Sequence, residues 1–250
     1  SDEQPAHRVR IERPYWLGRF EITNQQFQRF DSAHDSRLEH GDFLQFSHEE
    51  RGYLLDAPQQ PVCRVSWNQA LAFCEWLSQV TSQKFTLPSE SQWEYACRAG
   101  TQSLLSYGDL DADFSSFANL ADTSLSKVDS FAPWQLPVGA VPPWRPADDR
   151  FTDGYRVTAP IGSYQPNAWG LFDMHGNVAE WTSSSLAKYR QSTSDREDTT
   201  VESRRVVRGG SWYDRPSQAR AGYRSSYWPF QQVYDVGFRV VCEDRAEQAP

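Results

Sequence analysis

Three short segments in the first hundred residues begin with the same polar signal. Each has Ser or Thr followed three residues later by Gln, starting at Thr23, Ser66 and Ser89. This capping-box pattern satisfies backbone N–H groups that lack partners at a helix start. After Ser66, apolar residues recur at the spacing of one helix face. They are Trp67, Ala70, Leu71, Cys74 and Leu77. The sequence therefore predicts three short helices, the last ending at Gly100.

The rest of the chain shows less periodicity. Residues 7–23 alternate as an extended segment, and short strands are predicted within 204–212, 219–226 and 236–242. Residues 100–166 are rich in Asp, Ser, Pro and Gly, and a loop of this length is uncommon in a compact domain unless something such as a bound metal orders it. No internal repeat or linker divides the chain. We therefore predict one α+β domain over residues 1–250, with few regular elements and long loops.

Composition narrows the function classes. The 250 residues carry 25 basic and 33 acidic side chains, a net charge of −8, which argues against nucleic acid or an anionic membrane as the main partner. No apolar run approaches the ~20 residues of a membrane span, and the opening residues show no secretory signal pattern. Aromatic residues make up 14% of the chain and suit either a core or a ligand surface.

Five strings place the chain beside a known family. They are "EITNQQF" (21–27), "LPSESQWEYACRAG" (87–100), "GLFDMHGNVAEWT" (170–182), "RVVRGGSW" (205–212) and "VGFRVV" (236–241). In this order they resemble the formylglycine-generating enzyme, or sulfatase-modifying factor, family over residues 7–242. The resemblance implies a C-type-lectin-like α+β fold with little regular secondary structure. Because this fold carries several functions, it does not by itself imply the activity.

The resemblance also implies two structural calcium sites. The predicted ligands of the first are Asn119, Leu120, Asp153 and Tyr155, with Leu120 and Tyr155 acting through main-chain carbonyls. Those of the second are Asp173, Gly176, Val178 and Glu180, with carbonyls from Gly176 and Val178. Calcium takes six to eight oxygen ligands in flexible geometry, and ion binding is linked to folding, so calcium would explain an ordered acidic loop region. The alternative interpretation is ordinary turn residues in solvated loops.

Copper-dependent members of this family hold the metal with two thiols after the GGS string. The matching positions here are Asp214 and Ala219, and neither side chain can replace a thiolate on copper. The resemblance therefore implies no copper and no formylglycine generation by that route. It further implies a disulfide between Cys97 and Cys242, with two buried free thiols as the alternative.

The loop that lacks the thiols contains other side chains that can bind a ligand. Its carboxylate, arginine forks and aromatic rings suit recognition of a carboxylate, a sulfate or sugar hydroxyls, although a surface ion-pair network explains the same residues. Asp214, Arg215 and Arg224 are also candidate catalytic groups. The candidate ligand-binding residues are Ser211, Trp212, Tyr213, Asp214, Arg215, Arg220, Tyr223, Arg224, Tyr227 and Trp228.

Residues 32–60 form a candidate insertion that holds three of the five histidines, among them His34 and His40. A transition-metal site, a solvated polar loop and a substrate-facing loop with His34, Asp35 and His40 as catalytic candidates all remain open, since the spacing matches no metal motif. His175, within residues 170–182, is expected to be a hydrogen-bonded histidine that supports the second calcium loop.

Three functions follow from these observations. The first is a calcium-stabilised module, without formylglycine-generating activity, that recognises a glycan, a sulfated ligand or a peptide through the loop after GGSW. The second is an enzyme of different chemistry, hydrolytic or dependent on another metal, with Asp214, Arg215 and the His34–His40 loop in one pocket. The third is a pseudoenzyme that partners a sulfatase or an active family member. Calcium binding favours a secreted or periplasmic location, and the oligomeric state stays open.

Overall fold

Two small sheets form the frame of the molecule in the computed structural model, which describes residues 8–36, 53–124, 147–186 and 203–243. The first sheet is antiparallel in the order β1 (Tyr15–Leu17), β7 (Val241–Glu243) and β2 (Phe85–Thr86). The second has the order β5-β4-β3-β6. Its strands are β5 (Ser225–Tyr227), β4 (Arg205–Arg208), β3 (Ala179–Ser185) and β6 (Val236–Gly237). Only β3 and β6 pair in parallel within this sheet.

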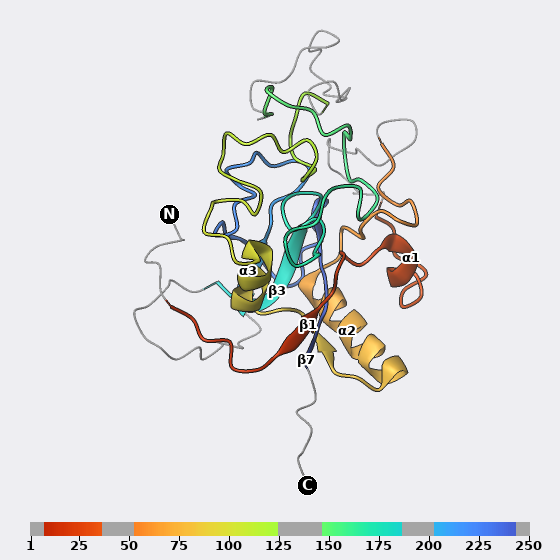
Figure 1. Cartoon of the computed structure of the whole chain (residues 1–250). Helices are drawn as coiled ribbons and strands as arrows, with labels where there is room; N and C mark the ends of the chain where they lie inside the picture. Colours follow the sequence, from red (N-terminus) through yellow and green to blue (C-terminus); the bar gives the residue numbers. More distant parts are fainter. Residues whose placement is uncertain (1–7, 37–52, 125–146, 187–202, 244–250) are drawn as a thin grey trace.

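The three predicted helices form where the capping boxes lie. They are α1 (Asn24–Phe27), α2 (Trp67–Thr81) and α3 (Glu90–Arg98). In each, the Ser or Thr side chain accepts the N–H of the Gln three residues later, and that Gln accepts the N–H of the capping residue. The left-handed residue that ends α3 is Ala99, with φ of 45°, and Gly100 follows it. Figure 1 shows α2 beside β1 and β7 at one end of the molecule.

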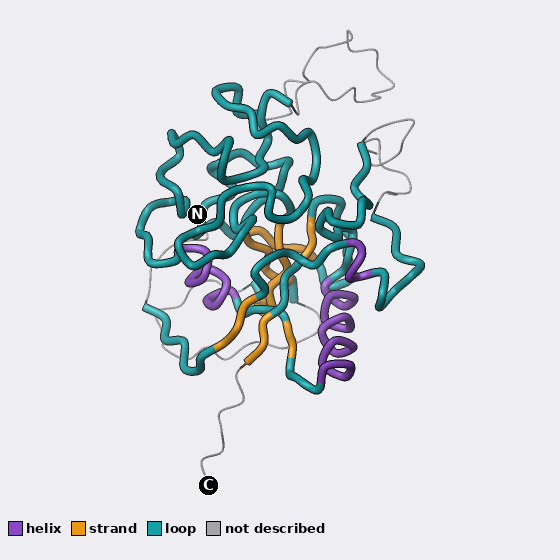
Figure 2. The backbone as a smooth tube through the Cα atoms, turned by 45° about the vertical axis from the view of Figure 1, so that its right-hand side comes forward, coloured by secondary structure: helices purple, strands orange, loops and turns teal. Residues whose placement is uncertain are grey.

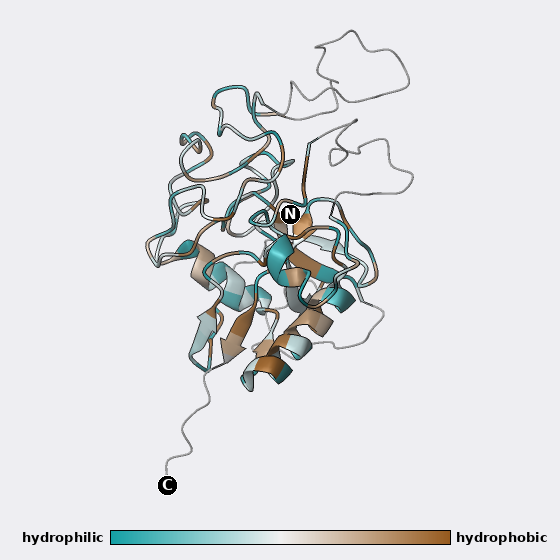
Figure 3. Cartoon of the chain, turned by 90° about the vertical axis from the view of Figure 1, so that its right-hand side faces the viewer, coloured by the Kyte–Doolittle hydropathy of each residue, from teal (hydrophilic) through white to brown (hydrophobic). Residues whose placement is uncertain are grey.

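The main hydrophobic core lies between α1, α2 and the strands. Phe27, Phe73 and Phe238 pack with ring centroids 5.5 to 6.1 Å apart. Trp181 of β3 is fully buried beside them, and its indole N–H donates to the Val65 carbonyl at 2.7 Å. Much of α2 is coloured hydrophobic in Figure 3. Burial of large aromatic groups contributes about 1.5–3 kcal/mol each, so this core fixes the sheets relative to α2.

Loops make up the opposite end of the molecule (Figure 2), and buried amide side chains join them. Asn119 Nδ2 donates to the Val157 carbonyl at 2.8 Å and to Asn177 Oδ1 at 3.1 Å. Asn177 Oδ1 also accepts the N–H of Ala159 at 2.9 Å. A Cβ at Gly176 would lie 2.0 Å from the Asn119 carbonyl oxygen, so only glycine lets these two loops touch. Hydrogen bonds of side-chain amides therefore order part of the loop region for which the sequence suggested a bound metal.

The α+β class with long loops is confirmed. The longest strand, β3, begins within the string 170–182, where no strand was predicted, because its buried polar residues hide the alternation. Residues 37–52 of the predicted insertion, His40 among them, lie outside the described residues. Within the described part of the chain, no helix has the length and apolar character needed to cross a bilayer.

Candidate functional site

A cavity of about 150 Å³ lies between the loop after Gly209-Gly210-Ser211-Trp212 and the second sheet. We call it the GGSW pocket. Strands β3, β4 and β5 contribute Ala179, Val207, Ser225 and Tyr227 to its wall. Its polar lining comes mainly from four tyrosines and two aspartates. These are Tyr213, Asp214, Tyr223, Tyr227, Tyr234 and Asp235.

The backbone of this loop depends on a glycine. Gly210 has φ of +66°, and a Cβ there would come within 3.0 Å of the Ala219 Cα and of the Gln218 carbonyl oxygen. Glycine therefore lets the chain fold back on itself over residues 210–219. Trp212 is buried behind the pocket against Tyr213 and Tyr234, with ring centroids 5.5 and 6.1 Å away.

One serine joins the two aspartates of the pocket. Ser211 Oγ lies 3.0 Å from Asp214 Oδ2 and 2.8 Å from Asp235 Oδ2, and the Ser211 N–H donates to Asp214 Oδ2 at 3.0 Å. A serine hydroxyl has one proton, so it cannot donate fully to both carboxylates. The shared hydroxyl therefore holds the two carboxylates close together.

Burial changes the proton affinities in the pocket. It raises the pKa of Asp214, against the hydrogen bonds from Ser211, which lower it. Burial also raises the pKa values of Tyr227 and Tyr234, and the nearby Asp235 and Asp214 raise them further. Both phenols are therefore neutral near pH 7 and present rings and hydroxyls to the cavity.

The predicted arginines do not line the pocket. Arg224 is buried and forms an ion pair with Glu90 of α3, with Nη2 2.9 Å from Oε2. Arg215 is exposed. Arg220 donates to the Ser217 carbonyl at 2.6 Å, with its guanidinium 6.0 Å from the Tyr223 ring centroid. The predicted arginine-lined groove for sulfate or carboxylate is therefore not what the described residues form.

Four of the ten predicted ligand-binding residues line the cavity, namely Tyr213, Asp214, Tyr223 and Tyr227. Ser211 and Trp212 support it from behind, and Trp228 is 39% exposed outside it. Tyr234 and Asp235 also line the cavity but are not among the residues predicted from the sequence. Their signal was their position directly before the string 236–241, whose strand β6 pairs with β3 beside the pocket.

The described residues of the histidine loop, His34 and Asp35, do not line the pocket. His34 Nε2 lies 2.9 Å from the Cys63 carbonyl oxygen, so it donates there, and its ring contacts Phe27 at 4.8 Å. Burial lowers its pKa. Neither His34 nor Asp35 lines the cavity. His34 and Asp35 therefore do not share a pocket with Asp214, and His40, the remaining histidine of that predicted pocket, lies outside the described residues.

The predicted disulfide is not formed either, since none of the four cysteines is in a disulfide bond. Cys97, on α3, is buried with its sulfur 3.5 Å from His175 Nε2. Cys242, on β7, has its sulfur 3.9 Å from Gln83 Oε1. Strand β7 pairs with β1 and β2, and α3 instead packs on β3 and β4, which separates the two thiols. None of the four cysteines lines the GGSW pocket.

The residues of the first predicted calcium site fit a hard cation in part. Asn119 Oδ1 is buried and has no hydrogen-bond partner among the described residues. Burial, and then the neighbouring Asp122, raise the pKa of Asp153 to about 7. The Asp153 carboxylate also accepts the N–H groups of Leu120 and Tyr155 at 2.8 and 2.9 Å. An amide oxygen without a partner beside desolvated carboxylates is the oxygen chemistry that calcium prefers.

The second predicted set fits less well, because Glu180 has other partners. Its oxygens accept from Arg239 Nε and Nη2 at 2.7 and 2.6 Å, and from the indole N–H of Trp93 at 2.7 Å. Asp173 Oδ1 is buried without a partner among the described residues. Glu21, which is not among the predicted ligands, is a buried acid whose pKa is raised by burial and by the neighbouring Asp173 and Glu180. No group of three or more His, Cys, Asp or Glu side chains in the described ranges is arranged to hold a metal ion.

His175 is hydrogen-bonded as expected. Its Nδ1 lies 2.7 Å from the Ala219 carbonyl oxygen, and its Nε2 accepts the N–H of Ser106 at 3.0 Å. Complete burial lowers its pKa to about 4, so the ring is neutral. This histidine joins residues 170–182 to the GGSW loop at the position of the second missing thiol.

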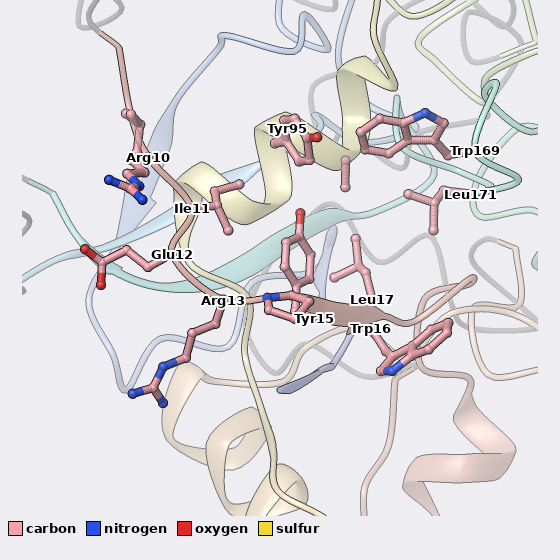
Figure 4. A pocket seen from close by; sticks show the side chains of 13 residues that line it. Arg10, Ile11, Glu12, Arg13, Tyr15, Trp16, Leu17, Tyr95, Trp169 and Leu171 are labelled. Atoms are coloured by element: carbon pink, nitrogen blue, oxygen red, sulfur yellow. The ribbon is translucent and has the colours of Figure 1, made fainter. Parts of the chain in front are cut away.

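A wider groove of about 870 Å³ lies along β1 and α3. Figure 4 shows Tyr15 and Leu17 pointing toward Tyr95 and Trp169, while Arg13 points away from them. We call it the β1 groove. None of the predicted site residues is among the described residues that line it. The GGSW pocket is therefore the better candidate site.

Comparison with known proteins agrees with the five strings. The family model for the sulfatase-modifying factor enzyme 1-like domain matches residues 1–244. The chain belongs to this family. The formylglycine-generating enzyme of Bos taurus is 27% identical over 96% of this chain and 68% of its own length. That of Streptomyces coelicolor is 32% identical over 79% of this chain and 56% of its own length.

Relatives without the activity are equally similar. The inactive C-alpha-formylglycine-generating enzyme 2 of Bos taurus is 30% identical over 76% of this chain. The chain spans only 52% of that relative's length. Among solved structures, PvdO from Pseudomonas aeruginosa has a TM-score of 0.72 and 26% identity over 97% of this chain and 85% of its own. Treponema denticola variable protein 1, with a TM-score of 0.65 and 21% identity over 92% of this chain and 84% of its own, supports the fold alone. Membership of the family thus leaves the activity to be argued from the pocket.

Proposed function

We propose that this chain is a ligand-binding member of its family that does not generate formylglycine by the copper route. The observation that carries the proposal is the lining of the GGSW pocket. Copper(I) requires soft thiolate ligands, whereas hydroxyl and carboxylate oxygens line this pocket and all four cysteines lie elsewhere. The ligand is a glycan or a peptide that places a polar group between the tyrosines and Asp214.

The charge of the pocket selects among the ligand classes predicted from the sequence. Asp214 and Asp235 would repel a sulfate, and the described residues that line the cavity include no arginine or lysine to attract one. Hydroxyl and amine groups instead donate hydrogen bonds to carboxylates. Tyrosine rings add apolar surface for a sugar face or a side-chain stem. We therefore place glycans and peptides above sulfated ligands.

Two measurements test this proposal. Incubation of the protein with copper and a cysteine-containing sulfatase peptide should give no formylglycine by mass spectrometry, and copper(I) titration should show no tight thiolate site. Glycan and peptide arrays should give a ligand whose affinity falls at least tenfold in Asp214→Asn and stays unchanged in Arg215→Ala, the exposed control. Formylglycine formation or tight copper(I) binding would refute the proposal. Binding of the sulfatase peptide without turnover would instead favour a pseudoenzyme, the class to which the inactive relatives point.

A second candidate function is an enzyme that transfers protons. The supporting observation is the pKa of Asp214, which burial raises toward the range useful for a general acid. In this candidate, Asp214 exchanges a proton with the bound ligand while Ser211 orients the carboxyl group. With a ligand found on the arrays, deuterium incorporation from heavy water should require Asp214 and be absent in Asp214→Asn at saturating ligand. No exchange in the unmodified protein would leave binding as the function.

We further propose that calcium stabilises the loop region through Asn119, Leu120, Asp153 and Tyr155. Two observations support this proposal. Asn119 Oδ1 is buried without a hydrogen-bond partner among the described residues, and the pKa of Asp153 is raised. Calcium would neutralise that carboxylate and complete the coordination of the amide oxygen. Asp173 remains a proposed ligand of a second ion, without Glu180. A calcium requirement would suit a secreted or periplasmic protein.

A further inference from the structure

Four exposed apolar side chains of the described residues gather at the β1 groove. Val9 is 36% exposed, Trp16 72%, Tyr95 54% and Trp169 48%, and all four line the groove. The Tyr95 and Trp169 rings meet edge to face, with centroids 4.9 Å apart. These side chains come from the segment around β1, from α3 and from a loop, so the fold brings them together. A patch of exposed apolar side chains of this kind is typical of an interaction surface.

The backbone of β1 is also available to a partner. This strand forms the edge of the first sheet within the described residues. The Gly18 N–H, directly after β1, donates to the Val240 carbonyl at 2.8 Å. Because main-chain groups alternate in direction along an antiparallel strand, Tyr15 and Leu17 direct their N–H and C=O groups away from β7. Both residues line the groove, so an extended chain lying there can pair with this edge.

The groove is basic at one end, although the whole chain has a net charge of −8. Arg10 and Arg13 line it and are exposed, and Glu12 is the acid among its described lining residues. Figure 4 shows both arginines at one end and Trp16 and Trp169 at the other. Complementary charge attracts a partner and fixes its direction. The partner therefore carries acids at one end and apolar side chains at the other.

We infer that the β1 groove binds an extended acidic peptide, which pairs with the edge of β1 and places apolar side chains against Tyr95 and Trp169. Acidic side chains of the peptide lie beside Arg10 and Arg13. The groove volume of about 870 Å³ lies within the range of about 300–1,000 Å³ for ligand pockets and suits a few residues. A sugar would stack on the same rings but would leave the strand edge unpaired. The described linings of this groove and the GGSW pocket share no residue, so the inference does not depend on the proposed function.

The test uses capped hexapeptides in calorimetric titrations of the full chain. The probe VFVFDE joins strand-forming apolar residues to two acids, and VFVFNQ is its neutral match. The acidic peptide should bind at least tenfold more tightly than the neutral one. Two further copies of VFVFDE are N-methylated, one at the valines and one at the phenylalanines. Only one of these two sets of N–H groups faces β1, so one copy should lose at least tenfold in affinity and the other should not.

Matched variants locate the binding site. Arg10→Gln combined with Arg13→Gln should remove the preference for the acidic peptide, whereas Arg29→Gln, exposed outside the groove, should leave it unchanged. Trp169→Ala should weaken binding of both peptides at least tenfold. Phe230→Ala, at a side chain that is 70% exposed outside the groove, should weaken neither. Melting curves of each variant check that it is folded.

n-Butylammonium, an amine probe for the GGSW pocket, separates this inference from the proposed function. VFVFDE should shift the NMR resonances of labelled Tyr15 and Tyr95, and n-butylammonium should not displace it. Displacement by n-butylammonium, or equal binding of the acidic, neutral and N-methylated peptides, would overturn the inference and leave the proposed function standing. The array and copper tests refute the proposed function without affecting the groove.

The remaining outcomes identify another occupant. No binding of VFVFDE at millimolar concentration would overturn the inference. A dimer of the chain that dissociates in Trp169→Ala would show that a second copy occupies the groove, which would also overturn it. Sugar binding that is lost in Trp169→Ala, without peptide binding, would assign the aromatic rings to a glycan instead and refute the peptide.

Discussion

Two groups of buried acids in this molecule differ in what compensates them. Around Glu180, the guanidinium of Arg239 reaches both carboxylate oxygens and also donates to the Phe172 carbonyl at 2.9 Å. Around Asp214 and Asp235, the described lining contributes hydroxyl groups and no cation. The first group carries its own counter-charge and holds three segments of the chain together. The second lies at a cavity, where a ligand can reach it, which separates a structural acid from a candidate ligand-binding one.

Removing the internal cation should have the largest effect. Arg239→Met leaves Glu180 buried beside Glu21 and Asp173 without its partner, and breaking a buried pair in this way costs about 3–5 kcal/mol. Chemical denaturation should show that loss in the free energy of unfolding. The double variant Arg239→Met/Glu180→Gln should recover part of it. If Arg239→Met is as stable as the unmodified protein, Glu180 does not depend on this ion pair.

Calcium removal should have the next largest effect. Chelation should lower the melting temperature by several degrees and calcium should restore it, because an ion at 100 times its Kd stabilises the native state by about 2.7 kcal/mol. Asp153→Ala should melt at the temperature of the chelated protein and no longer respond to calcium. Asp113→Ala, at an exposed position, should respond normally. A melting curve indifferent to chelation would remove calcium from the account.

The pH dependence of stability and of ligand affinity at the pocket should follow from the raised pKa of Asp214. A carboxyl group whose pKa is higher in the folded than in the unfolded chain stabilises the fold only while protonated. Its contribution is therefore lost as pH rises through the folded-state pKa. n-Butylammonium binds the ionised form of Asp214, so its affinity should rise over the same pH interval. Asp235 and the four tyrosines of the pocket also face the nitrogen. Asp214→Asn should flatten both curves, and an affinity that falls with rising pH would contradict the assignment.

Exposed arginines should have the smallest effect. Arg215→Ala changes neither group of acids, and surface substitutions usually shift stability by less than about 0.5 kcal/mol. Its melting temperature and n-butylammonium affinity should match those of the unmodified protein. A marked loss of affinity would bring Arg215 into the pocket and revive the anion-binding interpretation.

Local patterns predicted local structure well. The capping boxes at Thr23, Ser66 and Ser89 placed all three helix starts, because the two groups that satisfy each other lie three residues apart. Asp214 and the tyrosines after it were found because the resemblance pointed to their loop. These predictions required no knowledge of contacts between distant segments.

Long-range pairing was beyond the sequence. Arg224 looked free for a ligand, and its partner Glu90 lies 134 positions away. Asp235 becomes a site residue only because Ser211, 24 positions earlier, bonds it. Glu180 was a predicted calcium ligand until Arg239, 59 positions later, proved to bind its carboxylate. In each case the chemistry of the residue was clear and its partner was not.

Residue-specific NMR with labelled tyrosine tests the central claim most directly, because tyrosines line both the GGSW pocket and the β1 groove. On titration with n-butylammonium, the resonances of Tyr213, Tyr223, Tyr227 and Tyr234 should shift together, and those of Tyr15 and Tyr95 should not. Asp235→Asn should abolish the shifts. Shifts confined to Tyr15 and Tyr95, or shifts at the pocket that persist in Asp235→Asn, would contradict a ligand site at the GGSW pocket that includes Asp235.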